Sequence, residues 1–233
     1  MINKITVVPD SRASHIFFFK EMDITKLPDP RIVPLFGPNG AGKSTLISAI
    51  INAGIASQPQ IVIDRTSDKM HVYAYENSKD NFKAREARSY SEAFDPFFLS
   101  SRFDARSISE GQSIIYSAFD LLDGLKPGKN MFGSEDSETL VLLDEIDSGM
   151  SIDNIDTAMR KIKYALSKRN DLQIFMSFNS PRILKHFPNV ISMYDGSVLT
   201  LHTDEDMLAE IKKHKAIFDK ARKTSKGRPK IYE

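Results

Sequence analysis

The sequence contains no cysteine, and this absence excludes disulfide bonds, thiolate catalysis and zinc sites built on cysteine. It also has no apolar run approaching the ~18 residues that would indicate a transmembrane helix. The first residues lack the layout of a secretory signal peptide. Together these absences are typical of a protein from a reducing compartment, and we expect a cytoplasmic protein without membrane insertion.

Overall charge and histidine content give little functional information. Lysine and arginine number 32 against 31 acidic residues, so any contact with nucleic acid must come from a local cluster. At 233 residues the chain is long enough for one α/β domain with a well-buried core. The histidines are scattered without the spacing of a zinc site, at His15, His71, His186, His202 and His214.

A glycine-rich motif follows a short apolar run in the N-terminal part of the chain. Residues 37–45 read Gly-Pro-Asn-Gly-Ala-Gly-Lys-Ser-Thr and fit the phosphate-binding pattern G-x-x-x-x-G-K-[ST]. Residues 32–36 predict a strand before it and residues 46–51 a helix after it, which is the context that the motif requires. Glycine lets backbone N–H groups curl around an anion, and a helix N-terminus adds partial positive charge. The motif therefore predicts a nucleoside triphosphate site, with a glycine turn that binds nothing as the alternative.

The cofactors predicted by this loop are ATP and Mg²⁺. We expect Lys43 to reach the β- and γ-phosphates and the hydroxyl of Ser44 to bind the metal. The remaining phosphate contacts are expected from the loop itself, at Gly37, Asn39, Gly40, Ala41, Gly42 and Thr45.

A second motif places two acids after a buried strand. Residues 140–143 are wholly apolar, which predicts a parallel strand, and Asp144 and Glu145 follow directly. A carboxylate at the tip of a buried strand is costly, and that edge of an open α/β sheet is where ligands bind. We expect Asp144 to join the Mg²⁺ shell and Glu145 to act as the general base on the attacking water. A pair of helix-capping acids is the alternative interpretation.

A serine and a glycine lie between these two motifs, in the sequence Ile-Ser-Glu-Gly-Gln at residues 108–112. Ser109 is a natural N-cap and Gly111 permits close approach of a phosphate, although a capped helix also explains both residues. In this order, the segment resembles the LSGGQ signature of ATP-binding-cassette (ABC) ATPases. The resemblance implies a head-to-tail dimer in which Ser109 and Gly111 of one subunit cover the γ-phosphate held by Lys43 of the other.

Two further segments match the family by position and depart from it in identity. Residues 148–151, Ser-Gly-Met-Ser, stand where the family has S-A-L-D, so Ser151 replaces the final aspartate and Asp153 is a nearby substitute. The glutamine that the family carries in its Q-loop has no clear counterpart, and Glu76 and Asn77 are the candidates by position.

Residues 176–181, Met-Ser-Phe-Asn-Ser-Pro, resemble the family's S-T-H-S-P switch and place Asn179 at the histidine that contacts the γ-phosphate. Asparagine donates a hydrogen bond but takes up no proton. We therefore expect a slow ATPase, or a nucleotide-dependent switch that barely hydrolyses.

The spacing of the motifs resembles one branch of the family more than another. The segment from Lys43 to Ser109 is shorter than in ABC transporters, and the segment from the signature to Asp144 is longer. Both features are similar to RecF, OLD-type and chromosome-maintenance heads and to predicted ATPases of bacterial defence and mobile elements. The resemblance implies a DNA-linked or defence process with a nuclease or effector partner; the alternative is a transporter subunit.

A basic segment closes the sequence. Residues 226–230, Lys-Gly-Arg-Pro-Lys, resemble the core of an AT-hook, in which Gly-Arg-Pro lies in the minor groove of A·T-rich DNA. A solvated tail and non-specific phosphate binding are the alternatives. The basic residues from 212 onward are Lys212, Lys213, Lys215, Lys220, Arg222, Lys223, Lys226, Arg228 and Lys230.

Strand and helix patterns alternate along the chain, which predicts an α/β P-loop NTPase fold of ABC type. We expect a mostly parallel sheet flanked by helices, and a small antiparallel β subdomain near the N-terminus. The ATPase domain is expected over 1–210 and a basic tail over 211–233. The remaining predicted strands are 5–8, 15–19, 61–64, 71–75, 172–177 and 190–194, and the remaining helices are 79–93, 113–122, 152–167 and 204 to about 222.

Overall fold

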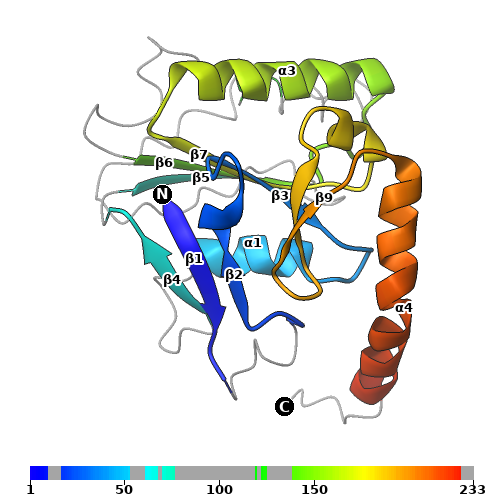
Figure 1. Cartoon of the computed structure of the whole chain (residues 1–233). Helices are drawn as coiled ribbons and strands as arrows, with labels where there is room; N and C mark the ends of the chain where they lie inside the picture. The colour runs from blue at the N-terminus through cyan, green and yellow to red at the C-terminus, as the bar shows by residue number, and fades with distance from the viewer. Residues whose placement is uncertain are drawn as a thin grey trace, which may run out of the picture.

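The computed structural model describes residues 1–9, 17–52, 61–67, 70–76, 119, 122–124 and 138–226, with side chains as far as residue 215 apart from those of Asn52 and Glu76. The predicted helix at 79–93 and most of that at 113–122 lie outside these residues. The elements, drawn in Figure 1, are β1 (Ile2–Val7), β2 (Glu21–Asp23), the 3₁₀ helix η2 (Ile24–Lys26), β3 (Ile32–Phe36), α1 (Lys43–Asn52), β4 (Ile61–Arg65), β5 (Met70–Glu76), β6 (Glu138–Asp144), α3 (Ile152–Lys168), β7 (Leu172–Ser177), the 3₁₀ helix η3 (Pro181–Lys185), β8 (Asn189–Ser192), β9 (Val198–Thr200) and α4 (Asp204–Lys226).

The larger sheet has six strands in the order β5-β6-β7-β3-β8-β9. All neighbours in it run parallel except β9, which is antiparallel to β8. Strands β3 and β7 are buried along their whole length, as expected for parallel strands covered on both faces. Pro34 stands within β3, next to the point where pairing with β8 begins at Leu35. A proline has no N–H to donate, and it is tolerated at position 34 because hydrogen bonding between β3 and β8 starts one residue later.

The smaller sheet is antiparallel and has the strand order β2-β1-β4. The predicted strand at 15–19 is wrong for the residues that are described: Phe17–Phe19 are not in a strand, and β2 begins at Glu21. Phe17 and Phe19 are buried, and their ring centroids are 5.3 Å apart. The alternation of buried and less buried residues looks like a strand in the sequence, although no strand forms at these residues. The small antiparallel subdomain itself is confirmed.

The two faces of the larger sheet are covered by different elements (Figure 1). Helix α3 lies on one face and buries a stripe at helical spacing against the sheet. Helix α1 lies on the other face, between the larger and the smaller sheet, and shares one apolar core with both. These layers confirm the predicted mostly parallel sheet flanked by helices. The buried stripe of α3 consists of Ile155, Ala158, Met159, Ile162, Ala165 and Leu166.

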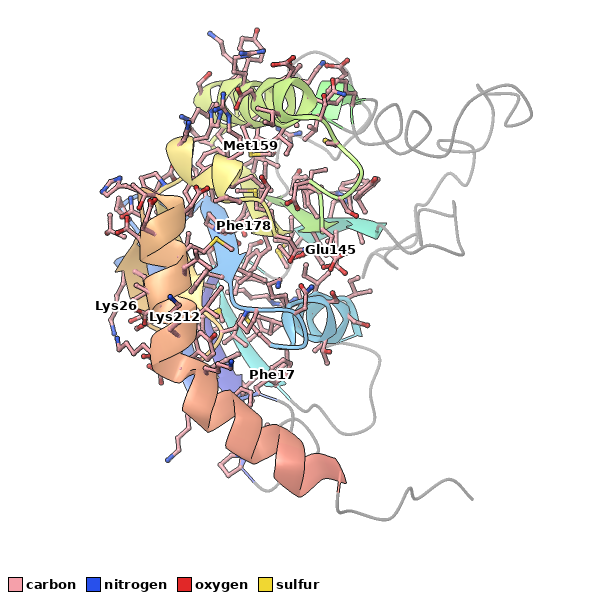
Figure 2. All side chains as sticks on the ribbon, turned by 90° about the vertical axis from the view of Figure 1, so that its right-hand side faces the viewer. Phe17, Lys26, Glu145, Met159, Phe178 and Lys212 are labelled. Atoms are coloured by element: carbon pink, nitrogen blue, oxygen red, sulfur yellow. The ribbon has the colours of Figure 1, made fainter. Side chains whose placement is uncertain are left out.

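Helix α4 begins with a reciprocal cap. Thr203 Oγ1 accepts a hydrogen bond from Asp206 N at 3.1 Å, while the carboxylate of Asp206 accepts from Thr203 N at 3.0 Å. Ile211 then packs on the core and His214 stacks on Tyr194 with ring centroids 4.2 Å apart. Figure 2 shows α4 along the side of the molecule. The helix continues without a break past residue 210, the predicted end of the ATPase domain, and into the basic residues that begin at Lys212.

Within the described part of the chain, no helix combines the length and the apolar character needed to cross a membrane.

Candidate functional site

Strand order explains why residues far apart in the sequence meet at one place. Strand β7 lies between β6 and β3, and all three run in the same direction. The segments that follow them, after Asp144, Ser177 and Phe36, therefore leave the sheet at the same edge. This is the carboxyl edge, at which ligands of open α/β sheets bind. The site described below consists of these three segments and the first turn of α1.

The loop between β3 and α1 turns through glycines in the left-handed region. Gly40 has φ 83° and Gly42 has φ 90°, which only glycine adopts without strain. The carbonyl of Gly42 accepts the first bond of α1, from Leu46 N at 2.8 Å. The first turn of the helix contains no acidic residue. The N-terminus of α1 therefore presents its partial positive charge to the loop without a carboxylate to neutralise it.

Gly37 permits the tight closure of this loop. A Cβ added at Gly37 would lie 2.8 Å from the Cβ of Ala41 and 3.1 Å from that of Met193. Ala41 N donates to the carbonyl of Pro38 at 3.0 Å, so the loop is already folded back on itself at this point. A side chain at position 37 would push the loop out of the shape that it has.

Lys43 is the most buried charged group of the site, with 5% of its surface exposed. Its Nζ donates to the carbonyl of Gly37 at 2.7 Å, to that of Pro38 at 3.4 Å and to Oδ1 of Asn179 at 3.4 Å. Burial lowers the pKa of Lys43, and the negative charges of Glu145, Asp144 and Asp147 oppose that shift. The ammonium therefore lies across the phosphate loop and reaches toward the tip of β7.

Ser44 and Asp144 bring two oxygen atoms together at the predicted metal position. Ser44 Oγ donates to Asp144 Oδ1 at 3.0 Å. Adjacent oxygens in an octahedral Mg²⁺ shell, with bonds of about 2.0–2.1 Å, lie about 2.9 Å apart. The two atoms therefore have the spacing of neighbouring ligands on one Mg²⁺ ion. The surplus of carboxylates over ammonium groups around Lys43 also favours a divalent cation.

Glu145 adopts an unusual backbone conformation just beyond the end of β6 (Figure 2). Its φ is 49°, in the left-handed region that a side chain with a Cβ adopts at a cost. Its backbone N–H donates to Ser177 Oγ at 2.7 Å, which holds this conformation. Across the described residues its carboxylate has no ion pair or hydrogen bond. A base at this position is thus free to accept a proton from water.

Ser177 joins the two strand tips and was not among the predicted site residues. It is fully buried, and its hydroxyl donates to Asp144 Oδ1 at 2.5 Å while accepting from Glu145 N. The hydroxyl therefore orients both acids of the second motif.

Asp147 was also missed by the sequence analysis. It is 8% exposed, and its Oδ2 accepts hydrogen bonds from the backbone N–H groups of Asn179, at 2.9 Å, and of Ser180. A third acid two residues after Glu145 was the available signal. Its two partners are 32 and 33 residues away in the chain, so only the pairing of β6 with β7 reveals them.

The structure brings together most of the predicted site residues that it describes. Lys43, Ser44, Asp144, Glu145 and Asn179 lie at one edge of the sheet, linked directly or through Ser177. Gly37 and Ala41 are buried in the loop, whereas Asn39, Gly40 and Thr45 are exposed. Ser109 and Gly111 lie outside the described residues.

The two family positions with altered residues have defined places. Ser151 is the N-cap of α3, and its Oγ accepts from Asn154 N at 3.4 Å, while Asp153 is exposed in the first turn of that helix. Glu76 ends β5 in register with Asp144 of β6, at the same sheet edge. Asn77 lies outside the described residues.

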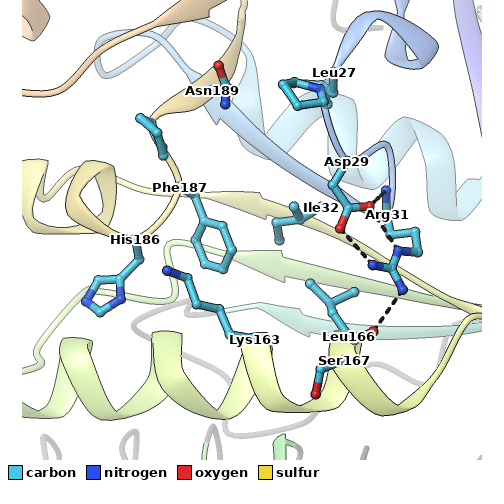
Figure 3. Close-up of a pocket in the computed structure, with 12 residues that line it drawn as sticks. Leu27, Asp29, Arg31, Ile32, Lys163, Leu166, Ser167, His186, Phe187 and Asn189 are labelled. Carbon is cyan, nitrogen blue, oxygen red and sulfur yellow. Dashed lines mark hydrogen bonds and ion pairs between the residues drawn. The ribbon is translucent and has the colours of Figure 1, made fainter.

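A cavity of about 340 Å³ lies elsewhere, at the amino ends of the strands (Figure 3). Its lining includes Ile32 at the start of β3, Leu166 near the end of α3, and Phe187 before β8. Arg31 in its wall is already bound to Asp29 and donates to the carbonyl of Leu166 at 2.8 Å. None of the predicted phosphate ligands lines this cavity, so we do not place the nucleotide there.

Comparison with known proteins agrees with this geometry. The family described as ABC transporter matches residues 24–168. A solved ATP-binding subunit of an ABC transporter has a TM-score of 0.53 and 16% identity, over 91% of this chain and 100% of that one. The ADP conformation of MJ1267, an ATP-binding cassette of an ABC transporter, has a TM-score of 0.51 and 11% identity, over 93% and 97%. At these identities the two structures show the shared fold. No curated protein matches the chain in sequence.

Proposed function

The chain belongs to the ABC transporter family of ATP-binding domains, and from this premise we propose that it hydrolyses ATP at the edge formed by β3, β6 and β7. One observation carries the proposal: the phosphate loop, the hydrogen-bonded pair Ser44 and Asp144, and the carboxylate of Glu145 meet at that edge. These are the groups that phosphoryl transfer to water requires.

Each group has a separate part in the proposed reaction. The loop N–H groups, the N-terminus of α1 and Lys43 bind the phosphates, and Lys43 exchanges its present carbonyl partners for phosphate oxygens. Ser44 and Asp144 would hold Mg²⁺, which supplies positive charge to the β- and γ-phosphate oxygens. Glu145 accepts the proton of the attacking water. Asn179 donates its side-chain amide to the γ-phosphate.

The active form that we propose is a head-to-tail dimer. Ser109 and Gly111 of one chain would cover the γ-phosphate bound by the other, as the resemblance to the family signature implies. Turnover would be slow, because Asn179 replaces the histidine of the family and takes up no proton.

Phosphate release from ATP with Mg²⁺ tests the proposal. Lys43→Ala should lower turnover about 100-fold or more, because it removes a buried charge aimed at the phosphates. Lys20→Ala, which removes an exposed lysine from the small β subdomain, should leave turnover unchanged. Equal rates for the wild type and Lys43→Ala would refute ATP hydrolysis at this loop.

The alternative is a nucleotide-dependent switch that barely hydrolyses ATP. A Glu145→Gln variant distinguishes this switch from an ATPase. Glu145→Gln should lower single-turnover hydrolysis by about 10²-fold or more if the carboxylate is the base. Glu205→Gln, which changes an exposed acid on α4, is the matched control. A rate that Glu145→Gln leaves unchanged would favour the switch.

Two observations point to different processes driven by the ATPase. The basic segment that includes Arg228 and Lys230 favours a DNA-linked or defence process with a nuclease or effector partner. The family match and the transporter cassettes of the same fold favour a motor subunit for a membrane partner. Co-purification with an integral membrane protein would support the second.

Stimulation of ATP turnover by duplex DNA at low salt would support the first. The test should use the full chain and a variant in which Lys226, Arg228 and Lys230 are glutamine. Truncation at residue 211 is a poor substitute, because it would remove His214 from Tyr194 and cut through α4. Stimulation that the glutamine variant loses would assign DNA binding to the basic segment.

A further inference from the structure

The segments that follow β6 and β7 hold each other through reciprocal side-chain contacts. The β7 segment contributes the hydroxyl of Ser177, which binds the backbone of Glu145 and the carboxylate of Asp144. The β6 segment contributes the carboxylate of Asp147, which binds two backbone N–H groups of the β7 segment. The acids of the candidate site and the position of Asn179 are therefore set by one interlocked pair of loops.

Asp147 is the contribution of the β6 segment to this arrangement, and it is 8% exposed. One carboxylate oxygen accepts from both Asn179 N and Ser180 N. The other oxygen is buried and has no hydrogen-bond partner among the residues that the structure describes. A buried carboxylate that accepts from two backbone N–H groups of another segment makes charge-assisted hydrogen bonds, which hold that backbone in place. The geometry maintained here is the backbone at Asn179.

The side chain of Asn179 does not secure its own position. It is exposed, and within the described residues its one hydrogen bond runs from Lys43 Nζ at 3.4 Å, which is longer than the usual 2.7–3.2 Å or so. On the far side of Asn179, Ser180 caps η3, and Asp156 of α3 holds η3 through Arg182. Between the buried β7 and this anchored η3, Asp147 is the group that fixes the backbone of Asn179.

We propose that Asp147 is a positioning residue that sets Asn179 against the γ-phosphate, so that preference for a triphosphate over a diphosphate depends on it. This inference rests on the proposed ATP site. Asp147 binds backbone groups through its carboxylate and acts on the nucleotide through Asn179. Loss of the carboxylate frees Asn179, whose contact is made only with the third phosphate, and leaves the contacts with the first two phosphates in place.

The test is the ratio of dissociation constants for ADP and for AMP-PNP, a non-hydrolysable ATP analogue, measured with Mg²⁺ by calorimetry on the full chain. Asp147→Ala should weaken AMP-PNP binding about tenfold, the size of one hydrogen bond to a charged group, and change ADP binding by less than about twofold. Asp147→Asn keeps one acceptor oxygen and should retain most of the preference. Asp204→Ala removes an exposed acid from the first turn of α4 and should leave the ratio unchanged.

A double-mutant cycle shows whether Asp147 acts through Asn179. Asn179→Ala alone should reduce the preference as much as Asp147→Ala, and the double variant should lose no more than either single variant. Losses that add would overturn the proposal, as would equal weakening of both nucleotides by Asp147→Ala. If Asp147→Ala fails to fold, Asp147→Leu, which fills the same space without an acceptor oxygen, takes its place in the cycle.

Failure of this inference and failure of the proposed function give different results. A wild-type chain that binds neither nucleotide would refute the ATP site itself. A wild-type chain that binds both without preferring AMP-PNP would leave the ATP site intact and overturn the role of Asp147.

Discussion

Replacing Ser177 with alanine tests the link between the acids of the second motif and the strand that carries them. The change removes a donor to the carboxylate of Asp144 and leaves the N–H of Glu145 without its acceptor. A hydrogen bond to a charged group contributes about 1.5–3 kcal/mol and an unsatisfied buried donor costs about 1–3 kcal/mol. Because the two effects overlap at one hydroxyl, we expect a loss of about 3 kcal/mol in the free energy of unfolding.

The same change should alter the metal dependence of ATP hydrolysis. Residues that orient a metal ligand affect metal affinity or activity by about 10–100-fold when they are removed. The Mg²⁺ concentration at half-maximal turnover should therefore rise by about that factor in Ser177→Ala. Urea unfolding measures the stability, and phosphate release at graded Mg²⁺ measures the metal dependence.

Ser192→Ala is the matched control for this prediction. Ser192 is also a buried serine at a strand end, and its Oγ accepts from Tyr194 N at 3.2 Å. The hydroxyl of Ser192 also binds the carboxylate of Asp195. Ser192→Ala should therefore lower the free energy of unfolding by about 1–3 kcal/mol and leave the Mg²⁺ dependence unchanged. A Ser177→Ala protein with the stability and the Mg²⁺ requirement of the wild type would show that Ser177 does not hold the two acids.

Three further predictions concern other parts of the fold. Gly37→Ala should weaken ATP binding at least about tenfold by titration, because its Cβ would lie 2.8 Å from that of Ala41. Gly196→Ala should lower the free energy of unfolding by about 3 kcal/mol or more in urea, because φ is +77° and a Cβ would lie 2.0 Å from a backbone carbonyl of β2. A hydrogen bond from Arg182 is the largest of the causes that hold the pKa of Asp156 below its usual 3.8. The carboxylate therefore stabilises the fold above that pH, and this stabilisation is lost on acidification. The difference in melting temperature between wild type and Asp156→Asn should therefore shrink as the pH falls below about 4, and a difference that is constant with pH would contradict this.

The parts of the site that lie within one continuous segment could be predicted from the sequence. The phosphate loop needs particular glycines, a lysine and a hydroxyl at fixed spacing between a strand and a helix, so the pattern identifies it directly. Asp144 and Glu145 were found because acids at the end of a wholly apolar strand conflict with burial. The mostly parallel sheet followed from the alternation of strand and helix patterns.

The contacts across segments could not be predicted in this way. Ser177 and Asp147 have ordinary residue types for their positions, and their partners lie 32–33 residues away. Only the register of β6 against β7 brings them together. At Phe17–Phe19 the sequence pattern led to a wrong strand prediction. Alternate burial can be read from neighbouring residues, but pairing with another strand depends on distant ones.

The most direct test of the account is the mass of the Glu145→Gln protein in solution with saturating Mg²⁺ and ATP. Without the proposed general base, the ATP-bound state should persist, and light scattering should report a particle of twice the 26.3 kDa of one chain. With ADP in place of ATP the mass should be that of one chain. A single-chain mass with ATP bound would contradict the proposed dimer around the nucleotide.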